Sequence, residues 1–209
     1  VFFFFSSVKF DDVNDTFRFF NPKAGLNYQL DEKNAFYGYF GIANKEPRRD
    51  DYESGAIKPE RLFDYELGWK YNSKKVKLSA NAFYMRYNDQ LVMTGALNDV
   101  GSPIFTNSGK SYRLGFEVES TIAITDKLIL NPNVTLSQNR NEDFYFQRDG
   151  VVQNLGNTNI AYSPNFIFGN RFSFLPVKGL QLSVLSKFVG DQYMGNIDSD
   201  NSKLDSYFI

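Results

Sequence analysis

The chain has 209 residues, of which 23 are basic and 24 acidic, with no Cys, no His and a net charge of −1. This balance gives no electrostatic footprint for nucleic acid, and the missing Cys and His exclude disulfides, thiolate zinc sites and the usual general base. A hydrophobic content of 42% with 17% aromatics is too high for a disordered chain. No apolar run is long enough for a transmembrane helix. We therefore expect neither an enzyme nor a bound cofactor.

Strands are expected along almost the whole chain. Taken in chain order, about ten of them are predicted, at residues 2–10, 17–30, 35–43, 64–71, 75–84, 113–124, 128–137, 165–174, 180–189 and 203–209.

Six of these runs, from 64–71 to 180–189, alternate with a period of two. One parity carries apolar or aromatic residues at 26 of 30 positions, and the other parity at 6 of 30. Successive side chains of a strand point to opposite faces, so the pattern predicts antiparallel strands with one apolar and one polar face.

The connections alternate between short and long. Tight polar turns are expected at 31–34, 72–74, 125–127 and 176–179, and long polar segments at 44–62, 88–111, 139–163 and 191–202. Short turns at one end and long loops at the other are typical of transmembrane barrels. Aromatic residues before the short turns suit a membrane–water interface; these are Tyr28, Trp69, Tyr71, Phe172 and Phe174.

These features predict an all-β fold, an antiparallel up-and-down transmembrane β-barrel. The polar face has few bulky fillers, which indicates a wide, wet lumen rather than a closed barrel of eight to ten strands. The final segment stops in mid-strand, and a sheet edge left unpaired in lipid is unfavourable. We therefore expect residues 1–209 to be a fragment of a larger barrel.

Several segments resemble TonB-dependent outer-membrane receptors, in the C-terminal part of their barrel. The resemblance spans roughly residues 17–209 and rests on segments in family order: NPKAGLNY at 21–28, YGYF at 37–40 leading to PRR at 47–49, KPERLFDYELGWKY at 58–71, NAFYMRYNDQL at 81–91, NSGKSYRLGFEVE at 107–119, and FVGDQY at 188–193 through LDSY at 204–207.

The resemblance implies a 22-stranded barrel with a plugged lumen, of which about ten strands are present here. The plug domain, the segment that meets TonB and the closing strands would then lie outside this sequence. It further implies the outer membrane of a Gram-negative bacterium, with the lipid bilayer as one partner and a small-molecule ligand such as a metal chelate as another. The segments resemble siderophore-type receptors more than glycan importers. The resemblance therefore implies active import of a ferric siderophore.

Candidate ligand contacts lie in the long segments and near the outer ends of the strands. Paired guanidinium groups suit anionic chelates because their donors are fixed and bidentate, and aromatic or amide side chains can stack on a ligand or hydrogen-bond to it. The candidates are Arg48, Arg49, Tyr52, Tyr87, Gln90, Arg140, Arg148 and Tyr193. The alternative is a solvated rim in which Arg and Asp side chains pair locally.

The sequence gives little support for a metal site or for catalytic carboxylates. The run at 198–201 lacks the Gly and Glu of a calcium loop, so no metal site is expected. Glu117 and Glu119 are expected to pair across strands with Arg113, Lys77 or Arg171. Open alternatives are a passive outer-membrane porin, a glycan or peptide importer of the same family, an outer-membrane protease or lipase, and a soluble β-sandwich that binds carbohydrate.

Overall fold

The computed structural model describes residues 15–48, 51–52, 58–97, 101, 103–107, 109–148 and 151–209. Its main feature is one antiparallel sheet of ten strands, most of which follow chain order. The strands are β1 (Lys23–Gln29), β2 (Asn34–Lys45), β3 (Glu60–Asn72), β4 (Val76–Asn88), β7 (Lys110–Thr125), β8 (Leu128–Glu142), β12 (Phe166–Phe174), β13 (Leu182–Val189), β16 (Tyr207–Phe208) and the short β11 (Thr158–Asn159), which pairs with β8. No helix in the described ranges is long and apolar enough to cross a membrane.

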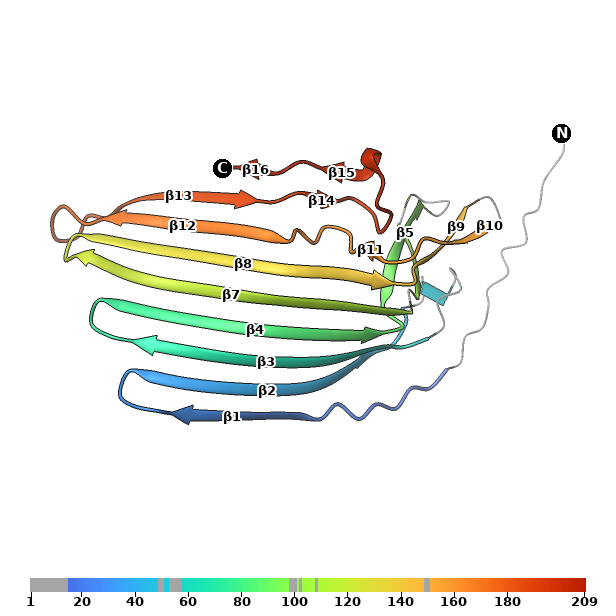
Figure 1. The fold of residues 1–209 in the computed structure, drawn as a ribbon, viewed down its shortest axis with the longest axis horizontal. Coiled ribbons are helices and arrows are strands. Elements are labelled where there is room, and N and C mark those ends of the chain that lie inside the picture. The colour runs from blue at the N-terminus through green and yellow to red at the C-terminus, as the bar shows by residue number, and fades with distance from the viewer. Residues whose placement is uncertain are drawn as a thin grey trace, which may run out of the picture.

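The short and long connections lie at opposite ends of the sheet, as the sequence predicts. Figure 1 shows the tight turns of the β1–β2, β3–β4, β7–β8 and β12–β13 hairpins at one end, and the segments that carry β5, β9, β10 and β11 at the other. The long segments contain hairpins of their own: β5 (Leu91–Leu97) pairs with β6 (Pro103–Asn107), and β9 (Tyr145–Arg148) with β10 (Val151–Asn154). We call the end of the sheet at which these long segments lie the loop end.

The first described strand is shorter than predicted. Residues 15–22 form no strand, and β1 begins at Lys23. Pro22 has no N–H that it could donate to a ladder, so the strand begins after it. Instead, the Asn21 side-chain oxygen accepts the backbone N–H of Asn44 at 3.1 Å and its amide at 2.7 Å. The strand predicted at 2–10 lies outside the described residues.

The predicted strand at 203–209 is divided. β15 (Lys203–Leu204) pairs with β14 (Gln192–Tyr193), whereas β16 pairs with β13. Between them, the backbone N–H of Ser206 bonds to the Asp191 carboxylate at 2.8 Å rather than to a strand. The C-terminal segment therefore crosses from the loop end to the main sheet in two steps.

Pro132 interrupts the β7–β8 ladder, whereas the β8–β12 register continues through it opposite Asn170. The β7–β8 register runs from Glu119–Asn133 to Ile122–Leu130, without paired positions opposite Pro132. Proline cannot donate to a ladder, which explains the gap. A side-chain bond from the Asn131 amide to the Thr121 hydroxyl, 2.8 Å long, links the two strands there.

The two faces of the sheet differ in the way that the alternation predicts. The apolar parity is exposed on the outward face, where Leu67 is 70%, Leu136 51% and Val184 66% exposed. Large apolar side chains in water are unfavourable, so this face requires a lipid neighbour.

Aromatic rings mark two levels on the outward face. Near the tight turns are Tyr28, Phe36, Trp69 and Phe174, all exposed. Towards the loop end, a second level comprises Phe40, Tyr65, Tyr84 and Tyr112, with successive ring centroids 5.0, 6.2 and 6.4 Å apart. Two rows of rings flanking an apolar band are the pattern of a membrane-spanning barrel wall.

Polar contacts connect the long segments at the loop end. Asp198 accepts the backbone N–H of Asn159 at 2.9 Å and its side-chain amide at 3.0 Å, and lies 3.7 Å from the Arg140 guanidinium. Asn196 accepts the backbone N–H of Ala161 at 2.9 Å. The segment 190–206 is thereby attached to the segment 155–163.

The facing of the sheet predicts different costs for Arg at two adjacent positions of β8. Val134 lies on the apolar face near the middle of the strand, so V134R should cost about 2–4 kcal/mol of unfolding free energy. Thr135 lies on the polar face opposite Glu117, so T135R should be nearly neutral. Unfolding titrations of the complete protein in lipid vesicles test this, and equal costs at the two positions would contradict the facing.

The contacts of Asp198 predict that D198A loosens the attachment between the two long segments. Amide hydrogen exchange at Asn159 should become faster in D198A, because one of its acceptors is lost. D200A is the control, since Asp200 lies on the same segment with an exposed side chain. Identical exchange rates in the two variants would show that Asp198 does not hold the segments together.

Candidate functional site

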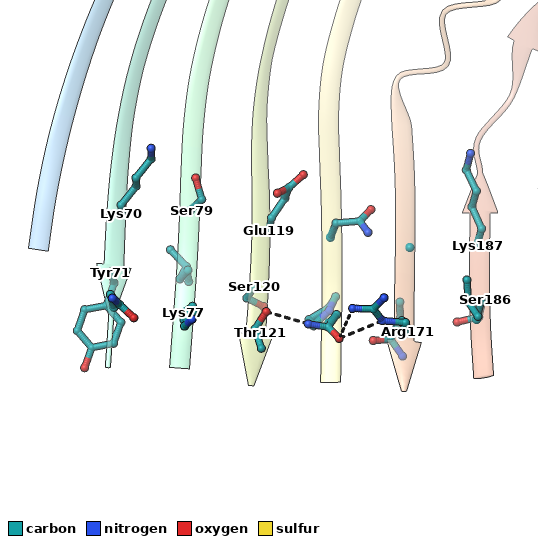
Figure 2. A pocket seen from close by; sticks show the side chains of 18 of the residues that line it. Lys70, Tyr71, Lys77, Ser79, Glu119, Ser120, Thr121, Arg171, Ser186 and Lys187 are labelled. Atoms are coloured by element: carbon teal, nitrogen blue, oxygen red, sulfur yellow. Dashed lines mark hydrogen bonds between the residues drawn. The ribbon is translucent and has the colours of Figure 1, made fainter. Parts of the chain in front are cut away.

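The polar face of the sheet forms a hollow of about 960 Å³ towards the tight-turn end. Figure 2 shows Lys70, Ser79, Glu119 and Lys187 reaching over it from β3, β4, β7 and β13. In its floor, the Arg171 guanidinium donates to the side-chain oxygen Oδ1 of Asn131 at 3.2 and 3.3 Å. Most residues that line the hollow are polar, whereas Leu78, Pro132, Leu185 and Ile209 are apolar. The polar side chains suit a hydrated or protein-filled lumen.

Aromatic side chains on this face lie along the wall instead of projecting into the hollow. The Tyr37 ring covers Gly68, where a Cβ atom would collide with the ring, and the Phe83 ring covers Gly115 in the same way. The Lys70 ammonium lies 5.3 Å from the centre of the Tyr37 ring. Glycine at these two positions therefore lets large rings lie flat, which keeps the lumen side open.

The cross-strand ion pairs expected for Glu117 and Glu119 are not formed among the described residues. In register, Glu117 lies opposite Asn81 and Thr135, and Glu119 opposite Ser79 and Asn133. The expectation was wrong because it used the parity of the strands without their register, which decides which side chains meet. Both carboxylates remain available on the polar face.

Tyr87 and Arg113 form the clearest pair on the polar face near the loop end. Tyr87 is half-buried, and the Arg113 guanidinium lies 4.9 Å from the centre of its ring. Sequence reasoning selected Tyr87 but assigned Arg113 to the glutamates. The shared parity of the two residues was visible in the sequence, whereas the β4–β7 register that brings Tyr87 beside Ser111 and Met85 beside Arg113 was not.

Arg48 lies at the loop end beside an acidic partner and a ring. Its Nε atom is 3.5 Å from Asp51, whose carboxylate also accepts the Arg48 backbone N–H at 2.7 Å. The guanidinium lies 5.3 Å from the centre of the Phe105 ring, while the Arg48 side chain remains 61% exposed. Arg48 is thus positioned by local pairing and still open to solvent. Arg49 lies outside the described residues.

The other candidates divide between buried and exposed positions. Gln90 is 7% exposed and accepts the Ser111 hydroxyl, so it supports the loop end instead of facing a ligand. Tyr52 is half-buried, with its hydroxyl enclosed. Arg140 pairs with Asp198. Arg148 lies in β9, at a position whose side chain is outside the described part of the structure.

Tyr193 lies in β14, beside an ion pair that closes the last long segment. The Lys203 ammonium is 2.8 Å from the Asp191 carboxylate. Hydrogen bonds from Lys203 and from the backbone N–H of Ser206 hold the pKa of Asp191 below its usual range, and the same contact raises the pKa of Lys203. Both groups are therefore charged at neutral pH. Their ion pair links the beginning of the last long segment, at Asp191, to its end, at Lys203.

The structure thus does not gather the candidates with described side chains into one site. Tyr87, joined by Arg113, faces the lumen side, while Arg48 and Arg140 belong to the rim formed by the long segments. The buried amide of Asn141, which donates to Thr158 at 3.2 Å and to Asn196 at 3.3 Å, was missed by sequence reasoning. It depends on a contact between residues 55 positions apart, for which the sequence carries no signal.

The solved structures with a similar fold include bacterial siderophore receptors. The siderophore receptor PiuA from Acinetobacter baumannii matches with a TM-score of 0.67 at 17% identity, over 89% of this chain and 28% of that one. The ferric enterobactin receptor PfeA from Pseudomonas aeruginosa gives 0.66 at 16%, over 90% and 31%. The ferric yersiniabactin uptake receptor FyuA from Yersinia pestis gives 0.63 at 18%, over 89% and 28%. The chain spans about three tenths of the length of these receptors.

A search of curated proteins gives no match. The family model described as TonB dependent receptor-like, beta-barrel, matches residues 4–209, which is nearly the whole chain. The matched span covers the ten-stranded sheet and all the segments at the loop end. The fold class and the family resemblance predicted from the sequence are confirmed. The chain belongs to the TonB-dependent receptor family and is part of the β-barrel of such a receptor.

Proposed function

We propose that the complete receptor imports an anionic metal chelate of the ferric siderophore type across the outer membrane of a Gram-negative bacterium. The observation that carries the proposal is the polar face of the sheet, which extends from the hollow to the loop end where all the long segments meet. A face that is hydrophilic along its whole length provides a path for a large polar solute, whereas the apolar outward face does not.

The charges at the loop end favour an anionic ligand. Arg113 on the lumen side and Arg48 at the rim each place a guanidinium group against an aromatic ring, and the Arg48 side chain is 61% exposed. Guanidinium donors bind carboxylates and catecholates in a fixed, bidentate geometry. Two of the similar structures are a ferric enterobactin receptor and a ferric yersiniabactin uptake receptor, which supports a ferric chelate as the ligand.

In this proposal the barrel wall binds and guides the ligand, and the energy for import enters elsewhere. A plug domain in the lumen and its contact with TonB would belong to the part of the receptor outside this chain, together with the closing strands. The polar lining of the hollow, which includes Lys70, Lys77, Arg171 and Lys187, supports this because such side chains can hydrogen-bond to a protein domain in the lumen. No residue of the wall is assigned a catalytic role.

The proposal predicts that R48A and R113A each weaken binding of an anionic ferric chelate to the complete receptor. Loss of one charge-assisted hydrogen bond costs about 1.5–3 kcal/mol, or roughly tenfold to a hundredfold in Kd. The measurement is a binding titration on outer-membrane preparations, with receptor abundance checked by immunoblot. K127A is the matched control, because Lys127 carries the same charge in a tight turn at the opposite end.

Unchanged affinity of both variants for every anionic chelate tested would contradict the ligand class. If the receptor instead took up a neutral glycan or peptide, the family and the fold would stand, and the site would be assigned to a different substrate.

A further inference from the structure

We propose that the outward face of the sheet carries a contact surface for a second copy of the receptor in the same membrane. The surface is the polar row, defined by the residues at which the outward parity of the six alternating runs carries no apolar side chain. These are Ser120 of β7, Pro132 of β8, Asn170 of β12 and Ser186 of β13. The polar row lies on the face opposite to the proposed ligand path, so the inference does not rest on the proposed function.

The members of the polar row are far apart in the sequence but lie side by side on neighbouring strands. Pro132 pairs with Asn170, and Asn170 pairs with Ser186. Ser120 completes the row, because its position faces the interruption of the β7–β8 ladder at Pro132. Neighbouring strands are about 4.8 Å apart, so the row is roughly 14 Å long. The exceptions to the alternation are therefore gathered at one place on the outward face.

The polar row lies inside the apolar band and not at the membrane surface. On β12, Phe174 of the aromatic level near the tight turns is four residues beyond Asn170. On each of the four strands, the residues two positions before and two positions after the row share its face and are apolar. They are Val118 and Ile122, Leu130 and Val134, Phe168 and Phe172, and Val184 and Phe188. In the complete barrel the row therefore faces the hydrocarbon of the bilayer.

Polar groups at this depth need partners that lipid tails cannot provide. A polar group in hydrocarbon without a hydrogen bond is strongly unfavourable. The side-chain oxygen of Asn170 is enclosed and has no hydrogen-bond partner among the described residues. A rotation about the last side-chain bond exchanges this oxygen with the NH2 group, so either one can face outward. A neighbour in the membrane that both donates and accepts hydrogen bonds would satisfy the amide.

A second copy of the receptor is the neighbour that matches the polar row. Two copies have the same orientation in one membrane, so a two-fold axis along the membrane normal brings their rows to the same depth. Asn and Ser side chains both donate and accept hydrogen bonds, which makes the row self-complementary, as a two-fold contact requires. The small side chains of Ser120, Pro132 and Ser186 let two backbones approach, as small residues do between membrane helices. Lipid headgroups lie outside the hydrocarbon and do not reach this depth.

The test counts subunits of the complete receptor in phospholipid vesicles by single-molecule photobleaching, over a range of protein-to-lipid ratios. The unmodified receptor should form dimers whose fraction falls as lipid is added. N170L removes the amide and should weaken dimerisation roughly threefold to thirtyfold, the range for hydrogen bonds between membrane segments. N133L is the matched control, because Asn133 is an exposed amide on the polar face, opposite Gly169. It should leave the dimer fraction unchanged.

Cross-linking gives a second measurement that does not depend on the folding of N170L. With S186C as the sole cysteine, a bismaleimide should yield a product of twice the receptor mass. L185C is the control, because Leu185 is adjacent in sequence but lies on the polar face, where it lines the hollow. L185C should give no such product.

A receptor that is monomeric at every protein-to-lipid ratio would overturn the proposal, as would equal dimer fractions in N170L and N133L. A cross-linked product of any other mass would also overturn it, because the polar row would then contact a different protein. Equal cross-linking of S186C and L185C would show that the contact between copies does not use the outward face.

Discussion

The backbone hydrogen-bond ladder is the constraint on which the rest of the structure depends. A backbone N–H or C=O left unpaired in hydrocarbon costs several kcal/mol, so a chain that crosses a bilayer as strands must pair each strand with its neighbours. The chain meets this requirement from β1 to β13 by hairpins in sequence order. Where Pro132 removes one donor, the Asn131 side chain links the strands instead. The ladder leaves only the side chains free to distinguish lipid from lumen.

That division assigns different tasks to the two faces of the same strands. On β7, Phe116 and Val118 point towards lipid, while Glu117 and Glu119, which alternate with them, lie on the polar face. Arg113, on the same polar face, meets Tyr87 near the loop end. The outward face can then carry lipid contacts and the inward face ligand contacts without competition, although one strand supplies residues to both.

The sequence predicts the strands and their facing well, because a period of two follows directly from strand geometry. It does not predict register or long-range contacts. The strand predicted at 17–30 begins only at Lys23, and the end of the chain divides around Ser206 because Asp191 accepts its N–H. Likewise, the contact between Arg113 and Tyr87 could not be predicted without the β4–β7 register. The contact between Asn141 and Asn196 could not be predicted because it joins residues 55 positions apart.

The facing of one strand in a membrane tests the central claim most directly. The chain has no Cys, so single Cys residues introduced along 113–124 of the complete receptor can each carry a spin label. Collision with lipid-soluble oxygen should peak at Leu114, Phe116 and Val118, and collision with a water-soluble nickel chelate at the positions between them. Alternation with this phase would support a barrel wall between lipid and a wet lumen. Water-soluble access at both parities, or no alternation, would contradict it.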